Sequence, residues 1–154
     1  MRLSKTEFRK KYFSAALAAD VVIYINSQDQ FLLIRRKNEP FKGKLAFPGG
    51  FLEPDEDFKD AALRELKEET AVQVNLNDLV TLGIYSKPNR DPRGRVVTVA
   101  FLVILENPVE FKACDDAKEA DLYKTQLLYD MKSDFAFDHF NIFQDALLKV
   151  KAIK

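Results

Sequence analysis

The chain has 154 residues, of which 47% are hydrophobic and 31% are charged, so it can bury one core and is neither disordered nor fibrous. Its 24 basic and 24 acidic residues cancel, which removes the overall positive field that non-specific nucleic-acid binding needs. The single cysteine, Cys114, cannot form an internal disulfide, and no apolar run reaches the length of a membrane span. We therefore expect one domain over residues 1–154, in the cytoplasm, without a membrane or nucleic-acid partner.

The first part of the chain predicts a strand hairpin and then a shorter strand. Residues 19–26 are rich in β-branched and aromatic side chains, a polar turn follows, and residues 31–37 predict the second strand. Alternation in that second strand places Arg36 on the face opposite Arg35, so one of the two can face a cleft while the other is in solvent. A loop then leads to a short strand predicted at residues 45–50.

The rest of the chain predicts helix, strands and helix in that order. Apolar residues recur at helical spacing from about Asp57 to Thr70, with acidic capping candidates at the start. Residues 80–86 and 95–105 predict strands, residues 112–121 an acidic loop, and residues 122–128 an apolar segment of either type. A last helix begins at about Asp138, its expected N-cap. This order indicates an α+β fold with a mixed sheet packed between helices.

Three glutamates stand together near the C-terminal end of the first predicted helix, where the helix dipole disfavours carboxylates. Glu65, Glu68 and Glu69 share a face because residues three and four apart are neighbours on a helix. Arg64 can pair with Glu68 or with Asp60, but one guanidinium does not neutralise the whole cluster. Carboxylate oxygens suit hard cations, chiefly Mg²⁺ or Mn²⁺, so the cluster indicates a metal site. The alternative interpretation of the cluster is an acidic helix face in solvent.

Two glycines precede this helix. Gly49 and Gly50 lack side chains, so a phosphate group or a metal ion can approach the backbone closely there. A backbone carbonyl oxygen at this place can complete a coordination shell.

The stretch from residue 50 to residue 72 resembles the Nudix box. The matching positions are Gly50, Glu56, Arg64-Glu65-Leu66, Glu68-Glu69 and Val72. The chain departs from the pattern at Ala71, where the family usually has glycine in a left-handed conformation that ends the helix. An alanine there costs roughly 1 kcal/mol if that conformation is kept, and no ligand is lost.

The resemblance implies a Nudix-type sandwich and a role for each residue of the box. It assigns metal binding to Glu65 and Glu69, with Glu68 close by and the carbonyl oxygen of Gly49 contributing. It further implies that Glu56 joins through water or a further metal ion. Arg64 would orient the glutamates, and Gly50 would lie beneath the pyrophosphate.

Nudix enzymes typically hydrolyse a nucleoside diphosphate linked to another moiety, with metal ions neutralising the phosphate oxygens. A carboxylate must take the proton from the attacking water. Glu68 and Glu69 are candidates, and so are Asp116 and Glu119 in the acidic loop, because many family members recruit a base or a further ligand from that region.

Substrate choice depends on residues outside the box. Pro88 lies sixteen residues after Val72, a spacing similar to that of the ADP-ribose pyrophosphatase subgroup, although residues 87–94 also read as an ordinary turn. Arg36 and Arg93 are candidate phosphate or ribose contacts, whereas His139, the only histidine, is expected to be structural. The resemblance implies a small-molecule nucleotide substrate, ADP-ribose giving AMP and ribose 5-phosphate, and a homodimer.

Other readings stay open at this point. Within enzymes, the alternative substrates are a damaged nucleoside triphosphate, NADH or a dinucleotide polyphosphate, while the mark of a coenzyme A hydrolase is missing from residues 31–37. From another class, a Nudix domain can sense ADP-ribose and regulate transcription without turnover. Such regulators generally carry a winged-helix segment, whereas this sequence stops soon after its last helix and keeps every glutamate, so we expect an enzyme.

Overall fold

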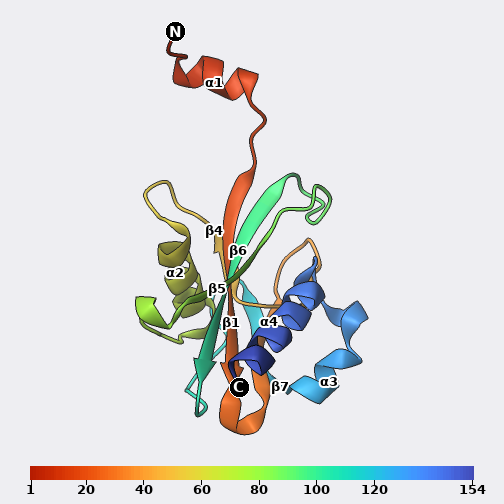
Figure 1. Ribbon diagram of the computed structural model, residues 1–154. Helices are drawn as coiled ribbons and strands as arrows, with labels where there is room; N and C mark the ends of the chain where they lie inside the picture. Colours follow the sequence, from red (N-terminus) through yellow and green to blue (C-terminus); the bar gives the residue numbers. More distant parts are fainter.

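The strand β1 (Ala16–Ile25) is central to the fold because it pairs with three other strands. It runs antiparallel to β2 (Gln30–Arg36) and to β4 (Gly49–Phe51), and parallel to β6 (Val96–Leu105). The computed structural model describes residues 1–154 and joins seven strands in one mixed sheet, with the order β3-β2-β1-β6-β5 and with β4 and β7 added at β1 and β2 (Figure 1). The predicted hairpin is thus confirmed.

Helices cover both faces of this sheet, as the α+β prediction requires. Alternate residues of β1 point to opposite faces. Ala19, Val21 and Ile23 pack on the side of α2 (Phe58–Thr70), and Val22 and Tyr24 pack on the side of α4 (His139–Ile153). Figure 1 shows α2 and α4 on either side of the strands. The mixed sheet packed between helices is therefore confirmed, and each face of the sheet has its own buried cluster.

Two regions differ from the prediction. Residues 117–121, expected in an acidic loop, belong to strand β7 (Ala117–Lys124), which pairs with β2, and the segment that follows contains α3 (Thr125–Tyr129). Four of the eight residues of β7 are charged and exposed, so its composition resembles a loop. The single strand expected at 45–50 is two short strands, β3 (Leu45–Ala46) and β4, and the remaining strand is β5 (Val80–Tyr85). Three 3₁₀ turns complete the elements, at Asn26–Gln28, Leu76–Asp78 and Lys132–Asp134.

A short first helix, α1 (Lys5–Lys11), was not predicted. The hydroxyl of Ser4 accepts from the amide of Glu7, whose side chain accepts from the amide of Ser4, and this capping box is readable in the sequence. Seven residues are too few to give a helical period. None of them is buried, and Figure 1 shows α1 standing beyond the end of the sheet. No helix in the structure is long and apolar enough to cross a membrane.

Helix α2 has a defined start and a strained end. Asp57 is its N-cap and forms a capping box with Asp60, so Asp60 is held at the start of the helix and does not pair with Arg64. Ala71 ends the helix with φ 62° and ψ 2°, which is the left-handed conformation that glycine adopts without steric cost.

The Ala71→Gly substitution is expected to stabilise the protein by about 1 kcal/mol, because it removes the contact between the Cβ and the following carbonyl oxygen. This corresponds to a melting temperature about 2–4 °C higher in a chain of this size, measured by thermal unfolding. Ala152→Gly is the matched control, since this exposed alanine lies within α4 and its replacement should not stabilise. A melting temperature that falls in Ala71→Gly would contradict the account.

Candidate active site

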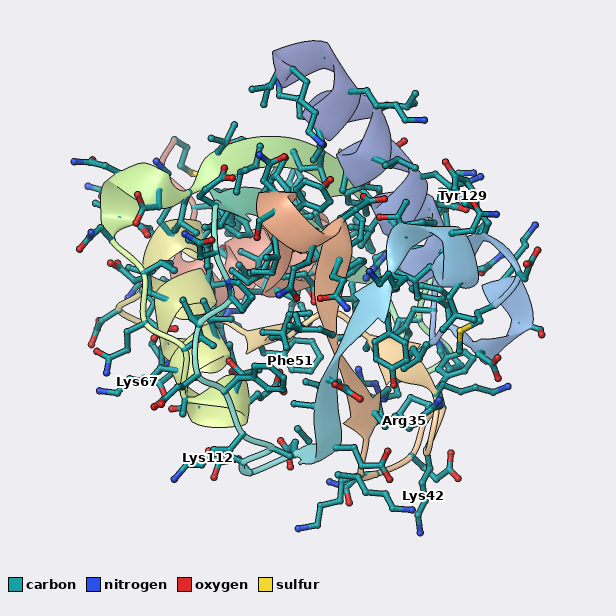
Figure 2. All side chains as sticks on the ribbon, turned by 90° about the horizontal axis from the view of Figure 1, so that it is seen from below. Arg35, Lys42, Phe51, Lys67, Lys112 and Tyr129 are labelled. Atoms are coloured by element: carbon teal, nitrogen blue, oxygen red, sulfur yellow. The ribbon has the colours of Figure 1, made fainter.

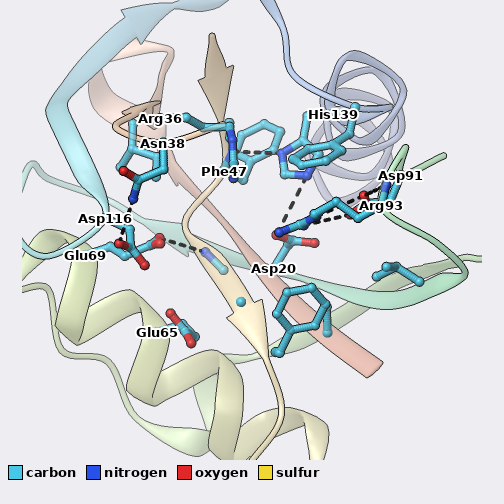
Figure 3. A pocket seen from close by; sticks show the side chains of 18 of the residues that line it. Asp20, Arg36, Asn38, Phe47, Glu65, Glu69, Asp91, Arg93, Asp116 and His139 are labelled. Atoms are coloured by element: carbon cyan, nitrogen blue, oxygen red, sulfur yellow. Dashed lines mark hydrogen bonds and ion pairs between the residues drawn. The ribbon is translucent and has the colours of Figure 1, made fainter. Parts of the chain in front are cut away.

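A pocket of about 600 Å³ opens where α2 meets β4, the start of α4 and the loop between β5 and β6. Its lining brings together most of the residues singled out in the sequence: Arg36, Gly49, Gly50, Arg64, Glu65, Glu69, Arg93 and Asp116. Figure 3 shows Glu65 and Glu69 on one side of β4, with Asp20 and His139 on the other. Segments that are distant in the sequence therefore face one space.

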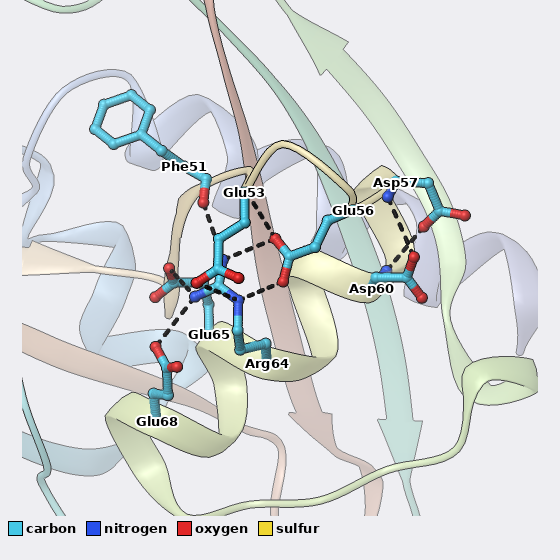
Figure 4. Close-up of polar contacts among 8 residues, drawn as sticks. All are labelled: Phe51, Glu53, Glu56, Asp57, Asp60, Arg64, Glu65 and Glu68. Carbon is cyan, nitrogen blue, oxygen red and sulfur yellow. Dashed lines mark hydrogen bonds and ion pairs between the residues drawn. The ribbon is translucent and has the colours of Figure 1, made fainter.

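Arg64 holds the glutamates near this pocket in place. Its Nη1 donates to Glu65 at 2.8 Å and to Glu68 at 3.1 Å, and its Nη2 donates to Glu56 at 2.9 Å and to the carbonyl oxygen of Phe51 at 3.0 Å (Figure 4). The hydrogen bonds from Arg64 hold the pKa of Glu56 well below its ordinary value, at about 2. One guanidinium thus joins three carboxylates of the box to β4, which ties the helix to the strand that carries the glycines.

Glu69 receives no bond from Arg64. Its side chain is buried, and its Oε2 accepts a hydrogen bond of 2.9 Å from the amide of Gly49. Burial raises the pKa of Glu69 to about 8, and the charges of Glu65, Asp20 and Asp116 add to the effect. Lys67 cannot relieve this charge, because it is exposed on the outer side of α2 (Figure 2). The pocket therefore contains more negative charge than the surrounding chain neutralises.

The two glycines of β4 leave no room for a side chain. A Cβ at Gly50 would lie 2.4 Å from Oε1 of Glu65, and a Cβ at Gly49 would lie 2.2 Å from Oδ1 of Asp20. Neither glycine has a positive φ, so close approach is what requires glycine here: the carboxylate of Glu65 at Gly50, and at Gly49 the backbone carbonyl oxygen of Ala19, at 2.4 Å, as well as Asp20.

The oxygen-rich lining suits a hard divalent cation. Glu65, Glu69 and Asp116 all face the pocket, and their crowding is what a cation would relieve. As the side chains are placed, no three His, Cys, Asp or Glu residues are close enough together to hold a metal ion. Glu65 is bonded to Arg64 and Glu69 to Gly49, so these carboxylates have to turn before they can share one cation.

A second wall of the pocket is cationic and aromatic. Arg93 donates to the buried carboxylate of Asp91 at 2.8 and 3.1 Å, and Arg36 donates to the carbonyl oxygen of Pro40 at 2.7 Å. Both guanidinium groups lie over the ring of Phe137, at 4.9 Å for Arg36 and 5.8 Å for Arg93. Burial, and then the charge of Arg93, lower the pKa of Arg36. Two cations held this close together favour an anion between them.

Asp116 and Glu119, the candidate bases outside the box, lie in different parts of the structure. Asp116 lines the pocket and accepts from Asn38 at 3.3 Å. Glu119 is in β7 opposite Arg35 of β2, and the two side chains pair at 3.7 Å outside the pocket lining. Alternation along β2 explains this difference, since Arg36, the neighbour of Arg35, is the arginine that lines the pocket.

Glu68 and Pro88 also lie outside the pocket lining. Glu68 is partly exposed at its edge and is held by Arg64, and Pro88 is exposed in the loop between β5 and β6. The same loop does reach the pocket through Arg90, Asp91 and Arg93, which line it. A bidentate ion pair attaches this loop to α4. Arg90 donates to Asp138, the N-cap of α4, at 2.6 and 2.9 Å.

Sequence reasoning missed several pocket residues. Asp20 and Asn38 line the pocket but belong to no motif, and Phe51, Asp91 and Phe137 line it although no role was expected of them. Asp20 offered one signal, because it is the only charged residue within the otherwise apolar strand β1. A buried charge in a strand needs a partner or a ligand, so the position itself indicates a site.

Comparisons with known proteins agree with this geometry. Residues 15–146 match the NUDIX domain. The chain is 43% identical to the ADP-ribose pyrophosphatase of Methanocaldococcus jannaschii over 134 residues, which are 87% of this chain and 74% of that protein. It is 32% identical to the ADPR responsive transcriptional repressor NtrR of Acinetobacter baylyi, over 92% of this chain and 57% of the repressor.

A solved structure shares the fold. The bifunctional NMN adenylyltransferase/ADP ribose pyrophosphatase of Francisella tularensis, complexed with AMP and a Mn ion, superimposes with a TM-score of 0.80 at 28% identity. The match covers 90% of this chain and 42% of that one. The family match spans most of the chain, and Gly50, Arg64, Glu65 and Glu69 of the box line one pocket. The chain therefore belongs to the Nudix family, as a Nudix pyrophosphohydrolase.

Proposed function

We propose that the protein hydrolyses ADP-ribose to AMP and ribose 5-phosphate with Mg²⁺ as its cofactor and Mn²⁺ as a substitute. The observation that carries this proposal is a pocket with a carboxylate wall on α2 and a cationic wall formed by Arg36 and Arg93. A pyrophosphate fits such a pair of walls, because its anionic oxygens can contact guanidinium groups on one side and a cation on the other. The similarity to an ADP-ribose pyrophosphatase supports the choice of substrate.

In this reaction the oxygen of water forms a bond to one phosphorus atom and the bridging P–O bond breaks. Glu65 and Glu69 would hold the cation, with Glu68 and the carbonyl oxygen of Gly49 nearby, and the cation would supply charge neutralisation of the phosphate oxygens. Arg64 keeps the glutamates oriented through its hydrogen bonds. Asp116 is better placed than Glu119 to take a proton from water, because only Asp116 lines the pocket.

The direct test is incubation of the purified protein with ADP-ribose and Mg²⁺, followed by identification of the products. We expect AMP and ribose 5-phosphate in equal amounts. Glu69→Gln should lower turnover about 10²-fold or more, since it removes one charge from the carboxylate wall, whereas the exposed Glu110→Gln should keep it. ADP-ribose that survives under metal-loaded conditions would contradict the proposal.

The second candidate function is an ADP-ribose sensor without turnover, and the similarity to the ADPR responsive repressor favours it. The same incubation separates the two candidates, because a sensor binds ADP-ribose and releases no AMP. The homodimer, the cytoplasmic location and the absence of a nucleic-acid partner stay predictions.

The burial of Glu69, with the neighbouring carboxylates as a smaller cause, predicts a pH dependence of stability in the metal-free protein. The pKa of Glu69 lies at about 8 in the folded chain against an ordinary value of 4.5, so between these values the folded state keeps a proton that the unfolded state has released. Stability therefore falls as the pH rises through this window. We expect thermal unfolding in EDTA to show this fall in the wild type and a smaller one in Glu69→Gln. Parallel curves for the two proteins would contradict the assignment.

A further inference from the structure

Asp20 is a buried carboxylate with only one of its oxygens hydrogen-bonded. It lies in the middle of β1, is 7% exposed, and accepts a hydrogen bond of 2.6 Å at Oδ2 from the hydroxyl of Thr98 on β6. Its Oδ1 has no hydrogen-bond donor, and Nε2 of His139 lies 3.8 Å from it. This distance is too long for a direct hydrogen bond.

His139 is the matching half of this pair. It is 4% exposed, and its Nδ1 accepts a hydrogen bond of 3.0 Å from the amide of Phe47. A neutral imidazole with an acceptor at Nδ1 carries its proton on Nε2, and burial lowers the pKa of His139, which favours the neutral ring. Nε2 is therefore a hydrogen-bond donor. It cannot act as a base toward water, because it already holds the proton.

Both side chains line the pocket, on the side of β4 away from the glutamates (Figure 3). Neither Oδ1 of Asp20 nor Nε2 of His139 has a hydrogen-bond partner within the chain, so a group between them is favoured if it donates to one and accepts from the other. A hydroxyl group does both, whereas a phosphate oxygen only accepts and an ammonium group only donates. A separation of 3.8 Å lets one hydroxyl oxygen sit at the apex of a triangle, at hydrogen-bond distance from Oδ1 and from Nε2.

We propose that Asp20 and His139 together bind one sugar hydroxyl of the substrate, which donates to Oδ1 of Asp20 and accepts from Nε2 of His139. The proposal rests on the proposed function, because ADP-ribose carries hydroxyls on its adenosine ribose and on its terminal ribose. The pair would act on substrate affinity and choice, and not on the bond-breaking step. Gly49 is part of the arrangement, since any side chain there would collide with Oδ1 of Asp20.

The test is the Asp20→Asn variant, in which the amide oxygen can still accept from Thr98 while an NH₂ group replaces the oxygen that faces His139. Three substrates are compared: ADP-ribose, its 2′,3′-dideoxyadenosine form, and ethyl-ADP, which lacks the terminal sugar. For a terminal-ribose hydroxyl, the KM of ADP-ribose and of its dideoxyadenosine form, which both carry the terminal ribose, should rise about 10- to 100-fold, with kcat little changed. The KM of ethyl-ADP should stay the same.

The other outcomes are also decisive. If the hydroxyl belongs to the adenosine ribose, the KM of ADP-ribose and ethyl-ADP should rise and that of the dideoxy form should not. An equal loss on all three substrates, or no loss on any, would overturn the proposal. Asp145→Asn is the matched control, because Asp145 accepts from Tyr85 outside this pocket, and its KM values should equal those of the wild type.

A second measurement needs neither turnover nor a variant. His139 is the only histidine, so in protein labelled with ¹⁵N-histidine the NMR signals of Nδ1 and Nε2 come from one imidazole ring. We expect the proton on Nε2, and a shift of Nε2 and its proton when saturating ADP-ribose is added in metal-free buffer. A proton on Nδ1, or an Nε2 signal that ADP-ribose leaves unchanged, would overturn the proposal. A shift in this experiment, together with no AMP released in the separate Mg²⁺-loaded incubation, would keep the hydroxyl site and refute the hydrolase.

Discussion

The unbalanced negative charge around Glu69 is the constraint on which the site depends. Three box glutamates share one guanidinium, that of Arg64, while Glu69 is buried with an amide of β4 as its hydrogen-bond donor. Other carboxylates from β1, α2 and the start of β7 face the same pocket. Folding alone gives no reason to concentrate charge in this way, since each buried carboxylate costs free energy unless it is paired. A divalent cation is the partner that such a set of oxygens lacks.

The pairing of β1 with three other strands brings the residues of the pocket together. Because β1 pairs with β2, β4 and β6, it places Asp20 beside the glycines of β4 and against α4. The opposing cations reach the pocket from β2 and from the loop that Arg90 anchors to α4. The pocket thus has one wall suited to a metal ion, one suited to phosphate, and a buried acceptor and donor suited to a hydroxyl. The carboxylates for the metal ion come mainly from α2, whereas Arg36 and Asp20 come from the sheet and His139 from α4.

A residue of the site could be predicted from the sequence where the residues it acts with lie close to it along the chain. The box glutamates, Arg64 and the glycines lie within one short stretch with helical spacing, so the sequence alone predicted them as a cluster. Arg36 and Arg93 were predicted only as candidates. Alternation along a strand predicts the face of the sheet on which Arg36 lies, but not which residues of other elements lie beside it. Glu119 and Asp116 were equal candidates for the base in the sequence. The register of β7 against β2 distinguishes them, because it places Glu119 opposite Arg35. The approach of Asp20 to His139 and the position of Phe137 beside two arginines depend on strand pairing and on the position of α4, which no local pattern encodes. Helix α1 could have been predicted from its capping box alone, but its seven residues are too few to show the apolar periodicity of a helix.

The most direct test of the central claim is a titration of the protein with Mn²⁺, followed by electron paramagnetic resonance of the free ion. The account predicts that the wild type and the exposed Glu110→Gln variant bind Mn²⁺ with the same affinity. Glu69→Gln should bind at least about tenfold more weakly, because it removes one charged oxygen ligand while keeping the size of the side chain. Equal affinity in Glu69→Gln and the wild type would contradict the claim that the buried carboxylates of α2 are gathered to hold a cation.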